Sequence, residues 1–336
     1  MATPASVLLR AGKQPKQRKS LHALQLTTLK AMAPQALAQR PAVVTSDPLA
    51  HLAPQRPNLG GGGADGGGRP MKRQRSEFPE LSPAARVLMD RGKASGDCWF
   101  CLSSKTAMSE AHMLVCIGMH SYLALAKGGI TQQNVLICPI QHETCFAALP
   151  AEAQAEIGRM KAGLAALYAS RGEVMLLWER NQMTRGPQHM QIQAVGLPAE
   201  NAEECRERFL AEGQSRGMQF QPIYGAVTAD AIRAVAPSQY LLLELPVGAG
   251  SDAPSALVCP LPLAGNRQPP LGLAREVIAG ILGRPELADW KSCSGSTEEE
   301  TAWTSELQQE WAPHDFTQDG GAENDAAAVE ALSGGA

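Results

Sequence analysis

Between residues 113 and 140 the chain alternates short apolar runs with turns rich in glycine and polar residues. Apolar runs of about four to eight residues, bounded by turn residues, are typical of β-strands. The pattern predicts three strands here, at residues 113–117, 122–126 and 135–140.

After residue 150 the apolar spacing changes to three and four, which is typical of an amphipathic helix. Pro150 stands near the expected start of this helix and Gly172 just past its end. Two further apolar runs, at residues 174–179 and 189–195, predict strands. Three strands, a helix and two strands favour an α+β domain with an antiparallel sheet, which we place at residues 86–199. The apolar stripe of the helix consists of Ala153, Ile157, Met160, Leu164, Leu167 and Tyr168.

The next part of the chain predicts a second, smaller α+β domain at residues 200–318. Its last helix should begin after Ser296 or Thr297, because the acidic run 298–300 is favourable at a helix N-terminus. The expected elements are helices at 200–215, 271–282 and 297–311 and strands at 218–224, 240–245 and 256–261.

Composition sets the ends of the chain apart from these two domains. Residues 1–85 hold 12 Lys and Arg against 4 Asp and Glu, with glycine runs at 60–63 and 66–68. Such a segment buries too little apolar surface to offset its conformational entropy, so we expect a disordered basic arm. A loose, disordered tail is expected at 319–336.

Two targeting signals compete within the arm. The cluster at residues 69–75 is typical of a nuclear import signal, and equally of a solvated charge run. The first 46 residues contain no acidic side chain, which is also the bias of an organellar transit peptide. We expect a nuclear protein and keep the organellar alternative.

Charge and cysteine usage limit the function of the body. Residues 201–336 hold 8 basic against 20 acidic side chains, so this part repels a phosphate backbone outside local contacts. Most of the eight cysteines lie in apolar runs and read as reduced core residues. No apolar run approaches the length of about 18 residues that suggests a membrane span.

Four residues form a candidate metal site: Cys98, Cys101, His142 and His189. Two cysteines one helical turn apart, with two later histidines on strand-like segments, supply the two sulfurs and two nitrogens that tetrahedral zinc accepts. Alone, the Cys-x-x-Cys pair also fits buried thiols or a redox couple, and His142 alone fits a satisfied histidine at a strand end. The full set favours structural Zn²⁺. The other histidines His112, His120 and His314 show no partner pattern.

A polar row shares the strand of His189. In an extended strand alternate side chains share a face, so His189, Gln191 and Gln193 point one way, and Met190 and Ile192 point into the core. Burying such a row is costly unless it faces a ligand, a metal or water. The row is therefore a candidate site.

The order of these motifs resembles that of histidine triad (HIT) nucleotide hydrolases and transferases, and more closely the CwfJ family. Members of that family are HIT-like proteins associated with the late spliceosome and intron-lariat turnover. The resemblance covers about residues 95–318, the two C-terminal regions of the family. Long members also carry an N-terminal metallophosphoesterase-like domain, and in this sequence a low-complexity arm stands there. The resemblance depends on Cys98-Trp99-Phe100-Cys101-Leu102, the segment 122–129, Glu179-Arg180-Asn181, His189-x-Gln191-x-Gln193, Ala288-Asp289-Trp290-Lys291 and the segment 311–317.

The resemblance implies the same four zinc ligands, Cys98, Cys101, His142 and His189. It also places Gln191 where HIT enzymes carry the nucleophilic histidine. An amide nitrogen has its lone pair delocalised into the carbonyl, so Gln191 cannot form a nucleotidyl intermediate. Gln191, Gln193 and Asn181 remain able to hydrogen-bond a phosphate or a base edge. Asn134 is a second departure, because family members often have histidine there.

The function implied is a non-catalytic, HIT-like nuclear factor of the late spliceosome and of lariat debranching in mRNA splicing. Its implied partners are spliceosomal proteins and the lariat-debranching enzyme, with direct RNA contact left open and no membrane. The alternative is a HIT-type nucleotide or phosphodiester hydrolase that uses non-covalent chemistry.

Overall fold

The structure, a computed structural model, describes residues 83, 86–87, 98–183, 187–246, 252–262 and 270–318. The chain divides into two units, residues 1–56 and 57–336, and all the described residues belong to the second unit. The predicted arm (except residue 83), its basic cluster at 69–75 and the tail at 319–336 lie outside the described residues.

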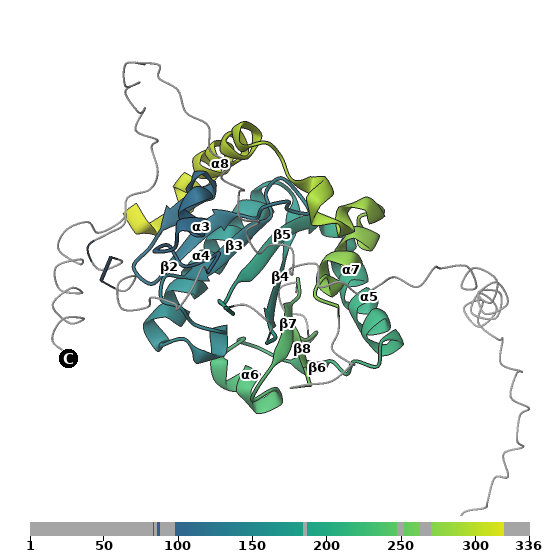
Figure 1. Cartoon of the computed structure of the whole chain (residues 1–336). Helices are drawn as coiled ribbons and strands as arrows, with labels where there is room; N and C mark the ends of the chain where they lie inside the picture. The colour runs from purple at the N-terminus through teal and green to yellow at the C-terminus, as the bar shows by residue number, and fades with distance from the viewer. Residues whose placement is uncertain are drawn as a thin grey trace, which may run out of the picture. The chain divides into compact units, whose positions relative to one another are not determined.

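An antiparallel sheet of eight strands, in the order β1-β2-β3-β5-β4-β7-β8-β6, forms the centre of this unit (Figure 1). The predicted α+β class with an antiparallel sheet is thereby confirmed. The strands are β1 (Leu114–Ile117), β2 (Ser121–Leu125), β3 (Val135–Pro139), β4 (Glu173–Asn181), β5 (Ile192–Pro198), β6 (Gln221–Ile223), β7 (Tyr240–Glu244) and β8 (Ala256–Pro260).

The sheet runs without a break through the boundary expected near residue 200. Strand β4 pairs with β5 on one side and with β7 on the other, so that Leu177 lies between Ala194 and Glu244. Residues beyond 200 thus add β7, β8 and β6 to the sheet that residues 114–198 begin. The two halves of the chain share one hydrogen-bonded framework.

Helices flank the sheet, and the four longest lie close to the predicted helical ranges. The last helix begins with a capping box, in which the Ser296 side chain accepts from the Glu299 backbone and the Glu299 side chain accepts from the Ser296 backbone. The predicted start at Ser296 is confirmed. No described helix has the length and hydropathy needed to cross a membrane. The α-helices among the described residues are α3 (Lys105–Ser109), α4 (Ala151–Ser170), α5 (Ala202–Ser215), α6 (Ala229–Val235), α7 (Leu273–Ile281) and α8 (Thr297–Trp311).

The two faces of the sheet are covered differently. One face packs against α4, α6 and α8 in a core that includes Leu123, Ile157 and Leu242. The other face carries two separate apolar clusters. The larger one lies under α5 and α7. The smaller one lies over β1, β2 and β3 and includes Tyr122 and Ile140.

Candidate metal centre

The two cysteines lie on the loop that precedes α3. Ser104 is the N-cap of α3, and its hydroxyl donates to the carbonyl of Cys98 while its backbone N–H donates to that of Cys101 at 2.8 Å. On the opposite side of the loop, the Tyr122 hydroxyl donates to the Phe100 carbonyl at 2.7 Å. The loop is therefore fixed to both α3 and β2, and both sulfurs point inward.

The two histidines come from neighbouring strand ends. His142 follows the end of β3 by three residues, and His189 precedes the start of β5 by three. Strands β3 and β5 pair directly, so these ends lie at the same edge of the sheet. A hydrogen bond of 2.6 Å from the Met190 N–H to the Glu143 carbonyl holds the two flanking segments together.

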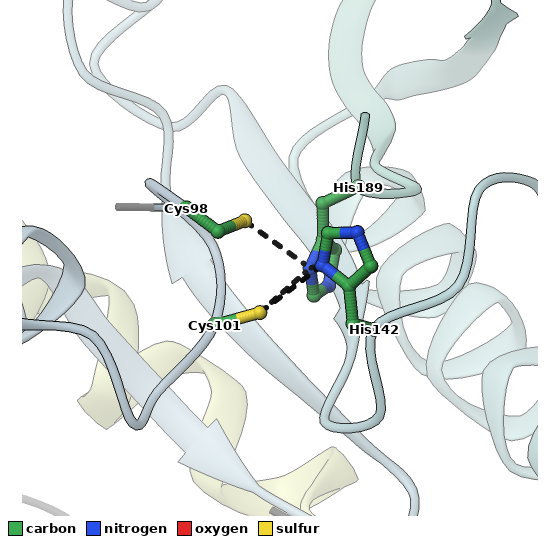
Figure 2. A group of neighbouring side chains, drawn as sticks. All are labelled: Cys98, Cys101, His142 and His189. Carbon is green, nitrogen blue, oxygen red and sulfur yellow. Dashed lines mark hydrogen bonds between the residues drawn. The ribbon is translucent and has the colours of Figure 1, made fainter. Parts of the chain in front are cut away.

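The four side chains converge, with one donor atom from each within 4.8 Å of every other (Figure 2). The Sγ–Nδ1 distances are 3.5 Å for Cys98–His189, 3.2 Å for Cys101–His142 and 3.4 Å for Cys101–His189. The two Nδ1 atoms lie 3.2 Å apart. A tetrahedral zinc ion with ordinary bond lengths needs about 3.5 Å between sulfur and nitrogen and about 3.3 Å between nitrogens.

Neighbouring groups prepare these atoms to bind a cation. His189 Nε2 lies 2.9 Å from the Pro139 carbonyl, a contact that places its proton on Nε2 and leaves the Nδ1 lone pair facing the sulfurs. The Phe100 N–H donates to Cys98 Sγ at 3.5 Å. The hydrogen bond from Cys101, helped by that from His189, holds the pKa of the Cys98 thiol well below its usual range although burial opposes this.

The donor set therefore fits zinc, and the protein supplies all four ligands. Cys98, Cys101 and His189 are each at most 5% exposed, so a bound ion would be shielded from solvent on most sides. A closed four-ligand site of this kind ties chain segments together and leaves no open position for a substrate or a reactive water. The chemistry that the arrangement supports is structural.

The polar row lies on the face of the sheet that carries two separate apolar clusters, one under α5 and α7 and one over β1, β2 and β3. Met190, Ile192 and Ala194 are buried in the core of the opposite face, as the alternation predicts. Gln191 and Gln193 are half-buried. Gln193 stands between Leu136 on β3 and Trp178 on β4, at the place where one cluster ends and the other begins.

Two asparagines considered from the sequence have structural contacts. Asn181 lies on the same face of β4 as Leu177, opposite to that of Gln193, and its amide donates to the Ser238 carbonyl at 2.8 Å. It does not share a surface with Gln191 and Gln193. Asn134 accepts from the Ile130 N–H at 3.2 Å and donates to the Ala194 carbonyl at 3.0 Å, which closes the turn between β2 and β3.

Glu179, which the sequence analysis names without a role, is a buried acid. Glu179 is 1% exposed and accepts hydrogen bonds from the Phe146 N–H at 2.7 Å and the Tyr240 hydroxyl at 2.9 Å. Burial raises the pKa of Glu179 to about 7. The sequence indicates this burial, because Glu179 lies two residues after Leu177 and therefore on the same core-facing side of the strand.

The fold and the Cys/His cluster define an antiparallel α+β protein with a candidate metal site. Residues 89–210 match the family described as "Protein similar to CwfJ C-terminal", and residues 236–317 match that described as "Protein similar to CwfJ C-terminus 2". The chain belongs to the CwfJ family and carries its two C-terminal regions.

Curated relatives extend beyond the matched region. The chain is 30% identical to CWF19-like protein 1 of Mus musculus, over 91% of this chain and 57% of that protein. It is 34% identical to CWF19-like protein 1 of Xenopus laevis, over 66% of this chain and 39% of the relative. It is 30% identical to Zinc finger CCCH domain-containing protein 59 of Oryza sativa, over 66% and 35% respectively. The chain thus spans little more than half of these relatives at most.

Proposed function

We propose that this chain is a non-catalytic, HIT-like nuclear factor that acts with the splicing machinery and takes part in intron-lariat debranching. Membership of the CwfJ family supports the splicing role. The observation that carries the non-catalytic part is the combination of a complete metal-ligand set with a glutamine at the neighbouring position 191.

The metal in this proposal is a structural Zn²⁺ held by Cys98, Cys101, His142 and His189. The matching Sγ–Nδ1 and Nδ1–Nδ1 distances support it, as does the hydrogen bond that fixes the tautomer of His189. When bound, the ion would cross-link the loop before α3 to the segment after β3 and the segment before β5. A histidine engaged in such a closed site is not free to act as a general base.

Gln191 supports a binding role in place of covalent catalysis. Its side chain is half-buried, as is that of Gln193. Strand alternation is expected to place the two amides on one face, where they can present donors and acceptors to a ligand. An amide cannot replace imidazole as the nucleophile on phosphorus. The pair thus suits recognition of a phosphate or of a base edge without turnover.

The proposed partners are spliceosomal proteins and the lariat-debranching enzyme. The test is copurification of the full chain from nuclear extract, with and without ribonuclease. Recovery of splicing proteins that survives ribonuclease is the expected result and indicates protein contacts. If recovery is lost on ribonuclease treatment, the chain binds RNA and not a protein partner. Recovery of no splicing component would contradict the splicing role.

An assay for turnover tests the non-catalytic part separately. Purified full-length chain is incubated with dinucleoside polyphosphates and cap analogues, beside a Gln191→Ala variant. We expect no hydrolysis above background by either protein. Hydrolysis that is present in the unmodified chain and lost in Gln191→Ala would establish the alternative, a hydrolase that uses non-covalent chemistry.

A further inference from the structure

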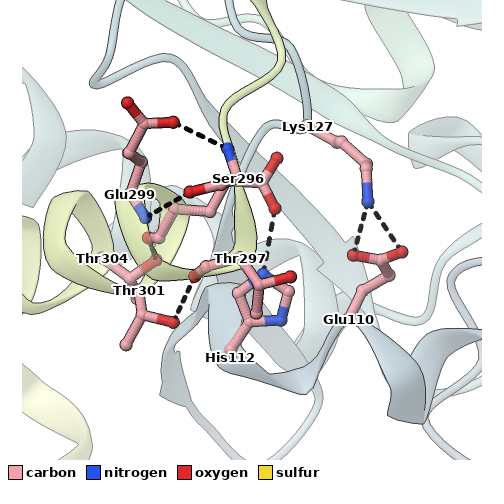
Figure 3. A network of polar contacts seen from close by, with 9 residues as sticks. Glu110, His112, Lys127, Ser296, Thr297, Glu299, Thr301 and Thr304 are labelled. Carbon is pink, nitrogen blue, oxygen red and sulfur yellow. Dashed lines mark hydrogen bonds and ion pairs between the residues drawn. The ribbon is translucent and has the colours of Figure 1, made fainter.

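A second cluster of metal-ligand side chains joins the first and last parts of the described chain. Glu110 precedes the short 3-10 helix η1 (Ala111–Met113), His112 lies within that helix, and Glu300 lies in the first turn of α8. One donor atom from each of these three residues lies within 4.8 Å of the other two. Figure 3 shows Glu110 beside Lys127, and His112 near Thr297, the first residue of α8.

The geometry within this cluster suits a divalent ion. His112 Nε2 and Glu300 Oε2 are 3.0 Å apart and form a hydrogen bond, which a bound ion would replace. Adjacent ligands of a six-coordinate ion with bonds of about 2.1 Å are separated by about 3 Å. Two carboxylates and one imidazole form a harder donor set than the Cys/His cluster, and they suit an ion such as Mn²⁺.

The burial of Glu300 supplies an independent indication. Its side chain is 2% exposed, and its Oε1 atom has no hydrogen-bond partner among the described residues. Native proteins seldom bury a carboxylate oxygen without a partner, because the lost hydration costs free energy. The helix N-terminus favours the negative charge of Glu300 but gives Oε1 no partner. A cation bound in the cluster would offset the charge of this buried carboxylate.

We propose that Glu110, His112 and Glu300 form a second divalent-cation site, separate from the Cys/His cluster and of different chemistry. Glu110 and His112 belong to the first CwfJ region and Glu300 to the second. A bound ion therefore pins the first turn of α8 to the segment that precedes β1. In this way the ion concentration controls how firmly α8 is attached.

Lys127 competes with this ion for the carboxylate of Glu110. Its ammonium group lies 2.8 Å from both carboxylate oxygens of Glu110, and its side chain is 39% exposed. An ion that takes up Glu110 displaces this ammonium into solvent, where a lysine chain is readily accommodated. Removing the charge at position 127 therefore strengthens ion binding.

The test is a titration of the purified full chain with Mn²⁺, followed by the loss of the electron paramagnetic resonance signal of the free ion. Mn²⁺ does not replace zinc at thiolates, so the Cys/His cluster and the proposed function are not disturbed. We expect one bound Mn²⁺ per chain, and at least tenfold weaker binding in both His112→Gln and Glu300→Gln. Lys127→Met should bind several-fold more tightly.

Glu298→Gln is the matched control, because it removes an exposed acid from the same helix turn and should leave binding unchanged. Circular dichroism checks that each variant is folded, and either the His112 or the Glu300 variant alone suffices if the other does not fold. Absence of Mn²⁺ binding overturns the proposal, as does binding that survives in a folded cluster variant. Binding seen only in Lys127→Met also overturns it, by showing that lysine holds the site in the natural chain.

Discussion

The two ends of one sheet face are covered by different means. Over β4, β7 and β8, helices α5 and α7 enclose a cluster of twenty buried apolar residues in the described part of the chain. Over β1, β2 and β3, the cluster has seven, and a loop with one short helix takes the place of the long helices. The Cys/His cluster lies at this second end.

The difference indicates where a bound metal ion would contribute most to stability. Burial of apolar surface stabilises by about 25 cal/mol per Å², so a small cluster holds a loop weakly. A structural zinc ion can contribute on the order of 10 kcal/mol, which is comparable with the net stability of a domain. We infer that the helix-covered end depends on packing and the loop-covered end on coordination.

Removal of a ligand should have the largest effect. Cys101→Ser is expected to lose bound zinc and to lower the free energy of unfolding by about 5 kcal/mol or more, since the loop loses its main attachment. Elemental analysis and urea unfolding measure the two quantities. Cys205→Ala is the matched control, because this buried cysteine lies on α5 at the other end. It should keep its zinc and lose only about 1 kcal/mol. Equal zinc loss in both would contradict the comparison.

Truncation at the helix-covered end should come next. Phe209 on α5 is 1% exposed, and Phe209→Ala is expected to lower the free energy of unfolding by about 3–5 kcal/mol because it leaves a cavity. Zinc content should not change. A variant that is destabilised as predicted but also loses zinc would show that the two ends are coupled.

The pH dependence of stability should reveal Glu179, which belongs to neither end. Its pKa is raised to about 7 in the folded chain from an ordinary value of 4.5, so the folded state binds this proton more tightly. The stabilisation is complete below pH 4.5 and is lost as the pH rises through about 7. Between about pH 6 and about pH 8 the unmodified chain should lose about 1 kcal/mol relative to Glu179→Gln in urea unfolding. If the free energy of unfolding has the same pH dependence in both proteins, Glu179 does not contribute in this way.

The smallest effect is expected in the polar row. Gln191→Ala removes a half-buried amide outside the ligand set, so the free energy of unfolding should change by no more than about 0.5 kcal/mol. Zinc content should stay the same. A loss of zinc in this variant would place Gln191 among the groups that support the metal.

Periodic patterns and ligand chemistry made much of this structure predictable. The stripe of α4 and the alternation through Met190 and Ile192 depend only on local geometry, as does the capping box at Ser296. The Cys/His cluster could be proposed because few combinations of residue types suit tetrahedral zinc. Whether the four atoms converge depends on the pairing of β3 with β5, which no local pattern specifies.

Other features depend on contacts between distant segments. Strand β6 spans only Gln221–Ile223, whereas the sequence predicts 218–224. It contains Pro222, which has no backbone N–H to donate to a neighbouring strand. Strand β5 begins at Ile192 and not at 189, because the Met190 N–H is engaged by the Glu143 carbonyl. The short helices α3 and α6 have too few turns to show a period. His112 showed no partner because Glu300 lies 188 residues away.

X-ray absorption at the zinc edge of the purified full chain tests for the proposed zinc ion and identifies its ligands. We expect one zinc per chain with two sulfur neighbours at about 2.3 Å and two nitrogen neighbours at about 2.0–2.1 Å. A chain purified without zinc and unable to take it up, or a zinc ion surrounded only by nitrogen and oxygen, would contradict the claim that coordination by Cys98, Cys101, His142 and His189 holds this end of the sheet.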